Sequence, residues 1–498
     1  MVDRIILQCI RIIYPELFID IKKRTHFLQD CRKICNFESP KNQIVTYVLM
    51  CKGNTNSSIV QAQTDFLELF EVKKKVEMSF SAPELSSLGG LSLLTKSAKN
   101  SDFLNRLSCQ IKDWRDPGLI IHTMQDLVRQ RVLQIAAGYE DADDCDLLRH
   151  DPMLKLAVGH TPEDRDLCSQ PTMTRLENHL SHRELWNIGN LFVNHFISSY
   201  KKEPDRIILD LDDSNSNAYG AQQLTLFNNY YGEYCYMPLF IFEAQSQRLV
   251  LPLLRPGRVN KQTNVCGLLK KLISRLREHW KHTVIIIRGD AMFSGHEFME
   301  WAMSQPRLHY IFGYKAYKPL QKLVESWRED VVQRYKETQE EIKEYHAIEY
   351  AAANWKCKQW TVVKIEHTEQ GCQTRFIVTD MKEKTARRLY EKDYCKRADC
   401  ELCIKEMKDG LRADRMSCNR FTANQFRLFL HAAAYVILLD AKQKLFRKTE
   451  MVNVTIQTFR QKLILMPVKI TEMKTKIKLE YQRDNPLRYK LRRALVFM

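Results

Sequence analysis

Hydrophobic residues in the second hundred positions recur at the spacing of amphipathic helices. Residues 124–135 and 185–196 each place apolar side chains three or four positions apart, with Arg129 and Arg131 on the other side of the first helix. Between them, Ser169 and Pro171 have the residue types of a helix start. A short polar helix after another helix is typical of a helix-turn-helix, and an ordinary bundle helix is an equally good interpretation.

The pattern changes from helical to extended after residue 200. Residues 206–214 predict a strand, and 234–243 and 248–254 are two further β-rich runs. Three strands in succession, joined by short connections, predict an antiparallel meander. A helix follows at 268–281, apolar on one face and basic on the other.

Residues 283–313 predict further strands and a helix of the same domain. Residues 283–287 are apolar on both faces and predict a buried strand. Ser294 and Glu297 have the spacing of a capping box, which places a helix directly after this strand, and 310–313 predict another strand. The order of three strands, helix, strand, helix and strand predicts an α/β domain.

The segment 318–385 interrupts this order. Residues 318–349 are rich in charge and predict a long surface helix, and 360–365 and 374–379 predict two strands. We interpret the whole segment as a β-containing insertion into the sheet domain.

Composition limits the function classes. The 498 residues are 44% hydrophobic and 28% charged, enough for about two to four domains with real cores. A net charge of +17 favours polyanions such as nucleic acid or an anionic membrane. The longest apolar run, 432–439, is too short to cross a bilayer, and Arg11 interrupts the apolar start, so no secretory signal is predicted. The fifteen scattered cysteines suit a reducing compartment.

Acidic side chains follow two of the predicted strands. Asp210 and Asp212 share one face of the first strand and Asp213 points to the other face, while Asp290 ends the strand at 283–287. Like charges so close disfavour each other's ionised form, and Mg²⁺ removes this cost by binding carboxylate oxygens. Neighbouring strand ends can bring Asp212 and Asp290 to a shared ion. An acidic strand end that caps a turn is the alternative.

A third carboxylate lies on a helix between residues 394 and 411. One stripe of this helix carries an acid among bases, beside a stripe of Cys400, Cys403 and other apolar residues. The acid could complete a metal site while the bases hold phosphates, although such pairs are also routine on exposed helices. The polar stripe consists of Tyr394, Arg397, Glu401, Lys405 and Lys408.

Cysteines in the same region allow a different hypothesis. Cys395, Cys400 and Cys403 have the spacing of an iron–sulfur site, and Cys418 could supply a fourth ligand. Because Cys400 and Cys403 lie on the apolar stripe, they can equally act as small hydrophobic residues.

The chain resembles a known family at specific positions. Tyr394, Arg397, Glu401 and Lys408 match the Y-(2)-R-(3)-E-(6)-K signature of DDE transposases of the insertion-sequence 4 type. Over about residues 76–440 it resembles one branch of these, the insertion-sequence 1380 family of bacterial transposases. The segments that carry this similarity are 80–90, 127–131, 138–141, 167–172, 209–213, 220–222, 227–228, 231, 255–257, 288–290, 414–418, 424–425, 427–428 and 431–435.

The resemblance implies an RNase H-like mixed sheet flanked by helices, with Asp212, Asp290 and Glu401 as the catalytic, metal-binding triad. Asp210 is the alternative first acid. The resemblance further implies Mg²⁺ or Mn²⁺, two ions in all, and DNA contacts from Tyr394, Arg397, Lys405 and Lys408. Ser214 and Tyr219 depart from the family, which usually has Thr and His at these positions.

The domain prediction follows from these patterns and from the resemblance. We expect double-stranded DNA, both terminal inverted repeats and target, as the partner of a homodimer or higher multimer in the bacterial cytoplasm, at the nucleoid, with no membrane association. A catalytically inactive, transposase-derived DNA-binding protein is the alternative function. The expected parts are a divergent segment 1–75, a helical DNA-end-binding region 76–200, the core at 201–317 and 386–440, the insertion 318–385, and a basic region 441–498.

Overall fold

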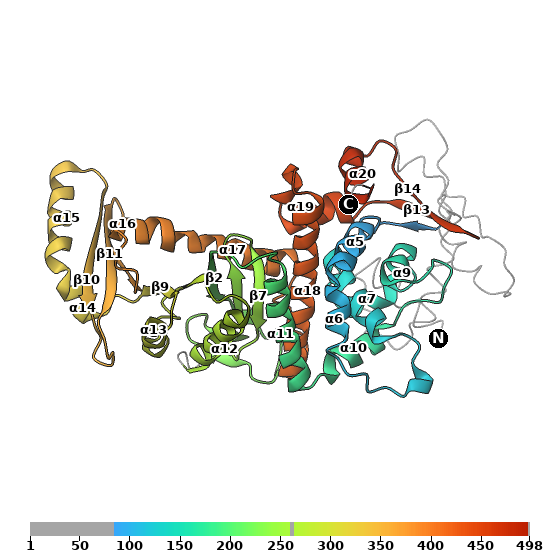
Figure 1. Ribbon diagram of the computed structural model, residues 1–498, viewed down its shortest axis with the longest axis horizontal. Helices are drawn as coiled ribbons and strands as arrows, with labels where there is room; N and C mark the ends of the chain where they lie inside the picture. The colour runs from blue at the N-terminus through green and yellow to red at the C-terminus, as the bar shows by residue number, and fades with distance from the viewer. Residues whose placement is uncertain (1–83, 259–262, 497–498) are drawn as a thin grey trace, which may run out of the picture. The chain divides into compact units, whose positions relative to one another are not determined.

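The computed structural model describes residues 84–258 and 263–496 (Figure 1), which belong to one compact unit that begins at Ala82. The expected divergent segment 1–75 lies outside the described residues. Within the described ranges, no helix is long and apolar enough to cross a membrane.

An eight-stranded mixed sheet forms the centre of the unit, in the order β10-β11-β12-β9-β8-β2-β6-β7. In this sheet β2 pairs parallel with β8 and antiparallel with β6, and β8 pairs parallel with β9. The antiparallel meander β2-β6-β7, followed by the parallel strands β8 and β9, is the RNase H-like arrangement, so the expected fold is confirmed. The strands are β2 (Arg206–Asp213), β6 (Leu239–Glu243), β7 (Arg248–Leu253), β8 (Val284–Gly289), β9 (Leu308–Tyr314), β10 (Ile342–Tyr350), β11 (Gln359–Thr368) and β12 (Gly371–Thr379).

Helices flank this sheet and form a bundle beside it. The long helix α18 packs against α5 and α7 on one side and against β7 on the other, so nearly all its side chains are buried. The helices before the sheet are α5 (Leu91–Ser101), α6 (Phe103–Ser108), α7 (Met124–Ala137), α8 (Asp144–Leu148), α9 (Pro152–Val158), α10 (Gln170–His179) and α11 (His182–Ser198). Those after it begins are α12 (Thr263–His279), α13 (His296–Met303), α14 (Lys318–Leu323), α15 (Glu325–Thr338), α16 (Ala386–Arg388), α17 (Ala398–Lys405), α18 (Phe421–Leu445), α19 (Ile456–Phe459) and α20 (Arg488–Val496).

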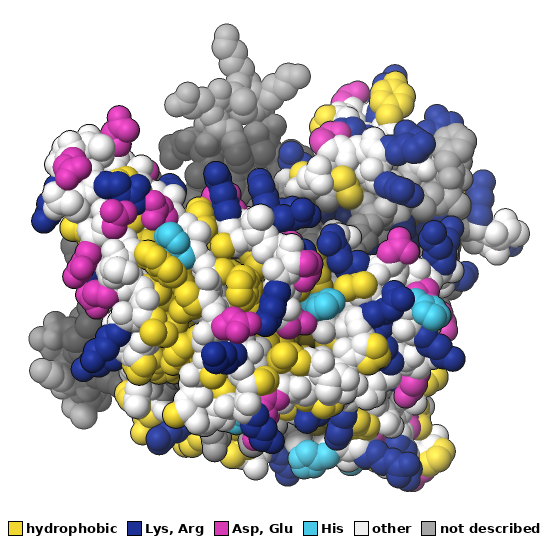
Figure 2. All heavy atoms as spheres, turned by 60° about the vertical axis from the view of Figure 1, so that its left-hand side comes forward, with side chains coloured by type: hydrophobic (Ala, Val, Ile, Leu, Met, Phe, Trp, Pro, Cys, Tyr) yellow, Lys and Arg dark blue, Asp and Glu magenta, His cyan; other side chains and the backbone are white. Residues whose placement is uncertain are grey.

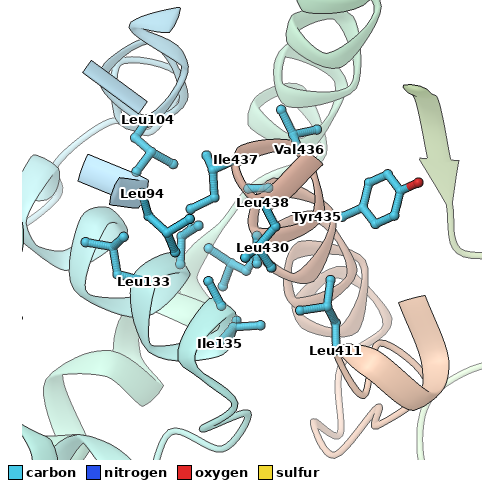
Figure 3. Close-up of a cluster of buried hydrophobic side chains, with 14 of the residues drawn as sticks. Leu94, Leu104, Leu133, Ile135, Leu411, Leu430, Tyr435, Val436, Ile437 and Leu438 are labelled. Carbon is cyan, nitrogen blue, oxygen red and sulfur yellow. The ribbon is translucent and has the colours of Figure 1, made fainter. Parts of the chain in front are cut away.

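Figure 3 shows why α18 is apolar on several sides. Leu430 and Ile437 lie among Leu94 and Leu133 of the neighbouring helices, whereas Tyr435 points the other way. The Tyr435 hydroxyl donates to the carbonyl of Gln247 between β6 and β7 (2.9 Å). The helix therefore joins the bundle to the sheet through one continuous hydrophobic core.

Two small sheets complete the architecture. β1 (Leu85–Ser86) pairs with β13 (Val468–Met473), which pairs with β14 (Lys476–Tyr481). The second sheet lies between β2 and β6 in the chain and consists of β3 (Ser216–Asn217), β4 (Leu226–Asn228) and β5 (Glu233–Tyr236). The predicted strand at 234–243 is therefore two strands in different sheets, divided at Pro238, which has no N–H to donate to a ladder.

Two further local predictions are wrong. The helix expected at 318–349 ends at Thr338, and β10 follows, because its residues find cross-strand partners on β11 such as Glu366 for Lys343 (3.1 Å). The capping box does not form. Ser294 donates to the carbonyl of Ala291 instead, and α13 begins after Gly295.

The helical region also differs from its prediction. Arg131, expected on the polar side of α7, is fully buried and pairs with Glu177 of α10 at 2.7 Å. Arg427 of α18 approaches the same carboxylate at 2.9 Å. Two cations hold the pKa of Glu177 below its usual value although its burial opposes this. The helix α10 is thus packed as a bundle helix, with this ion cluster at its inner face.

Candidate active site

The carboxyl ends of β2 and β8 bring two of the expected acids together. The two strands are parallel neighbours with Leu211 opposite Gly289, so Asp212 and Asp290 are the next residues in register. The amide of Met292 donates to Asp290 at 2.7 Å, and an added Cβ at Gly289 would lie 2.8 Å from the Phe293 ring. A tight turn after β8 therefore holds Asp290 beside Asp212.

Asp210 has a different environment. It is fully buried, and its two oxygens accept from Nε and Nη2 of Arg288 at 2.5 and 2.7 Å. Arg288 also donates to the carbonyls of Asp393 and Lys396. Burial raises the pKa of Asp210 and the Arg288 guanidinium opposes that rise. This pair ties the helical segment to the sheet, and both carboxylate oxygens are engaged in it.

Arg397 links the third acid, Glu401, to Asp212 at the end of β2. Arg397 donates to Asp212 at 3.1 Å with one nitrogen and to Glu401 at 2.8 Å with the other. Glu401 lies on α17, which follows a π-helical turn over Leu389–Tyr394 and a 3-10 turn over Cys395–Arg397. Such interruptions of an α-helix are frequent at functional sites. The guanidinium thus bridges an acid of the sheet and an acid of the helix.

The electrostatics of Asp212 indicate a concentration of negative charge. Burial, together with the charges of Asp290, Asp213 and Glu401, raises its pKa to about 7 against the lowering effect of Arg397. The neighbouring Asp213 pairs with Arg255 at 2.7 Å. The acids predicted from distant parts of the sequence therefore act on one another in the folded chain.

The remaining stripe residues divide into two groups. Lys408 donates to the hydroxyl of Ser214 and to the carbonyl of Asn215, both at 3.0 Å, directly after β2. Tyr394 packs beside the turn after β8, and burial raises its pKa. Lys405 is exposed and lines a separate cavity of about 400 Å³. The structure brings Tyr394, Arg397 and Lys408 to the strand ends and leaves Lys405 apart from them.

A cavity of about 590 Å³ opens at the strand ends, lined by Asp212, Asp213 and Asp290. Its other walls carry residues that the sequence reasoning did not select as site residues. In the sequence, the run of aromatic residues in a turn-rich stretch near residue 230 could have indicated these lining residues. These additional lining residues include Phe227, Tyr230, Tyr231, Arg258 and Lys315.

The donor chemistry of the three acids suits a hard divalent cation, since carboxylate oxygens are its preferred ligands and the charges of Asp290 and Glu401 act on Asp212. In the described residues no group of three or more His, Cys, Asp or Glu side chains is arranged to hold a metal ion. Arg397 supplies the positive charge between Asp212 and Glu401 instead.

The iron–sulfur hypothesis finds no support in the positions of the cysteines. Cys400 and Cys403 are buried in the hydrophobic core, as the alternative interpretation predicted, while Cys395 is exposed. Burial raises the pKa of Cys403 to about 11, which disfavours the thiolate that a cluster requires.

The chain thus has an RNase H-like sheet with acids at adjacent strand ends and a third acid on a following helix. The chain belongs to the family described as Transposase DDE domain group 1, whose model matches residues 70–497. Members of this family generally use divalent metal ions. Among solved structures, one similar chain belongs to a cryo-EM structure of a piggyBac transposase synaptic complex with hairpin DNA. The identity is 10%, the TM-score is 0.41, and the match covers 76% of this chain and 79% of that one. No curated protein sequence matches.

Proposed function

We propose that this protein is an active DDE transposase of the insertion-sequence 1380 type that cuts and joins DNA strands at the ends of an insertion sequence. The observation that carries the proposal is the register of β2 and β8, which sets Asp212 beside Asp290 while Arg397 links Asp212 to Glu401. A structural role alone gives no reason to place this much negative charge at one strand edge.

In this proposal Asp212, Asp290 and Glu401 would hold divalent cations, two in all. Bound ions of this kind activate water as a nucleophile and stabilise the charge that develops on the transferred phosphate. Asp210 is the weaker choice for the first acid because both its oxygens already accept from Arg288.

The basic residues at the strand ends would position the DNA backbone. Lys408 lies beside Ser214 and Arg397 lies between the acids, so both can contact phosphate oxygens near the bond that breaks. Water attack on that phosphodiester leaves a 3′-hydroxyl and a 5′-phosphate. In strand transfer the 3′-hydroxyl loses its proton, attacks a target phosphorus, and displaces the 3′-oxygen of the target strand.

The surface charge supports DNA as the partner. The chain has 77 Lys and Arg against 60 Asp and Glu, and Figure 2 shows Lys and Arg side chains spread across the face that it draws, with Asp and Glu between them. Positive charge supplies most of the affinity for a phosphate backbone. The helices before the sheet would bind the inverted repeats, and a homodimer would pair the two ends.

The test is cleavage of DNA that carries the inverted repeats read from the adjoining genomic sequence. Asp290→Ala should abolish Mg²⁺-dependent cleavage while DNA binding persists. Asp399→Ala, at an exposed acid on the same helix as Glu401, is the matched control and should cleave normally. Undiminished cleavage by the Asp290 variant would rule out the assignment. Binding without any cleavage by the unaltered protein would favour the inactive DNA-binding alternative.

A further inference from the structure

A groove of about 550 Å³ lies between α11 and α12, which are neighbours in the fold (Figure 1). Its lining follows one stripe of each helix, from His182 to Val193 on α11 and from Leu268 to Glu278 on α12. The groove therefore extends along about three helical turns, or roughly 15 Å. None of the acids at the strand ends lines it, so it is a separate site.

The floor of the groove is apolar. Leu251 of β7, Leu272 of α12 and Phe429 of α18 line it and belong to the hydrophobic core. The indole of Trp186 stands at the border and is 52% exposed. Apolar surface that remains open to water between two helices marks an interaction site.

One buried polar group in the lining lacks a partner. Gln425 of α18 is 5% exposed, and its Oε1 accepts from the amide of Leu254 at 2.7 Å. In the part of the chain that the structure describes, its Nε2 has no hydrogen-bond partner. A buried N–H without an acceptor destabilises the fold, and a helix end supplies acceptors, because the carbonyls of its last turn have no partner within the helix.

The border of the groove is positively charged. Lys270 and Lys271 line it, neither forms an ion pair with an acid among the described residues, and Lys271 lies over the Trp186 ring at 4.9 Å. The acid in the lining, Glu278, already pairs with Arg275. Positive charge beside an apolar floor suits an acidic partner, and it disfavours a second copy of this chain, whose net charge is +17.

We propose that this groove binds an amphipathic helix of a partner protein, with apolar residues at i, i+3 or i+4, and i+7 and with acidic residues beside them. A helix laid between α11 and α12 buries its apolar stripe on the floor, and three turns match the length of the groove. Its acidic residues lie opposite Lys270 and Lys271. This interaction goes beyond the proposed function and does not depend on it.

The experiment measures fluorescence anisotropy of a labelled synthetic peptide with the full chain at low salt. The peptide has about four helical turns, with leucine at i, i+3, i+4 and i+7 and with glutamate and alanine at the other positions. It should bind with a Kd on the order of 10 μM. A second peptide of the same composition, with its leucines spread around the helix, has the same charge and should bind about tenfold more weakly or worse.

Gly189→Leu tests the shape of the groove, because it adds a side chain to the α11 stripe that lines it. An added Cβ at Gly189 would lie 3.5 Å from Leu251 and 3.8 Å from Phe429, which are ordinary contacts, so the helix accepts the change. The variant should bind the first peptide about tenfold more weakly or worse. Asn187→Leu, on the same helix and outside the lining, is the matched control and should bind normally.

A charge reversal tests the border. Lys270→Glu with Lys271→Glu should lose the glutamate peptide and gain a peptide in which lysine replaces glutamate. Lys201→Glu with Lys202→Glu, at two exposed lysines outside the groove, changes the net charge equally and should keep the preference for the glutamate peptide.

Equal binding of the two glutamate peptides, no binding of either, or unchanged binding by Gly189→Leu would overturn the proposal. A shift of Gly189→Leu from dimer to monomer without peptide, measured by sedimentation, would overturn it too, because the groove would then be a contact between two copies. Because no cleavage is measured, failure here leaves the transposase proposal to its own test with Asp290→Ala.

Discussion

Replacing Asp212 with asparagine should stabilise the metal-free protein and abolish the proposed DNA cleavage. The pKa of Asp212 rises from its usual 3.8 to about 7 because the carboxylate is buried near other acids. A tenfold change in acidity corresponds to ~1.4 kcal/mol, so above pH 7 the ionised group costs the folded state about 4 kcal/mol. Asparagine has a similar shape without the charge.

The raised pKa of Asp212 determines how the stability of the folded chain changes with pH. The folded chain holds the Asp212 proton more tightly than the unfolded chain, so stability falls as pH rises from about 4 to about 7 and is then constant. The difference between variant and parent should therefore be absent near pH 4 and largest above pH 7. For a cooperative unit of roughly 400 residues, the gain at pH 8 corresponds to about 5 °C in Tm.

Thermal unfolding in EDTA at several pH values measures this effect. Asp213→Asn is the matched control at the next residue. It should destabilise, because Arg255, paired with Asp213 at 2.7 Å, would be left half-satisfied in a buried position. Adding Mg²⁺ should raise the Tm of the parent and leave that of the Asp212 variant nearly unchanged. If the asparagine variant is no more stable than its parent at pH 8, burial does not destabilise the ionised form of Asp212 and the reasoning is refuted.

Two further substitutions separate structural from metal-binding charges. Asp210→Asn leaves Arg288 buried without its carboxylate and should cost about 3–5 kcal/mol, measured by urea unfolding at neutral pH. An unchanged midpoint would count against the structural role. Arg397→Ala removes the cation that pairs with both Asp212 and Glu401, so Mn²⁺ should bind about fivefold tighter in the absence of DNA, measured by electron paramagnetic resonance of free Mn²⁺. Weaker Mn²⁺ binding by this variant would show that the guanidinium does not compete for the acids.

The alternation of side chains along β2 predicts Asp210 and Asp212 on one face and Asp213 on the other, since strand periodicity is a local property of the sequence. In the structure Asp212 and Asp213 line the same cavity, and Asp210 is buried apart from it. The apolar stripe of Cys400 and Cys403 likewise predicted a buried helix face. Local patterns failed where partners from elsewhere decided the structure. Residues 342–350 became a strand because β11 pairs with them.

What the sequence determined by itself was the set of elements in the core and the acids at their ends, because periodicity and turn chemistry act over a few residues. Only the tertiary structure decided which arginine pairs with each acid. Arg288 follows Asp210 by 78 positions and occupies both its oxygens, while Arg397 reaches Asp212 across 185 positions. Tertiary contacts also placed Tyr230 and Tyr231 in the lining of the 590 Å³ cavity. Their loop is held by the side chain of Asn228, which donates to the carbonyl of Gly257 in another loop. Such contacts depend on chain packing, which no local pattern specifies.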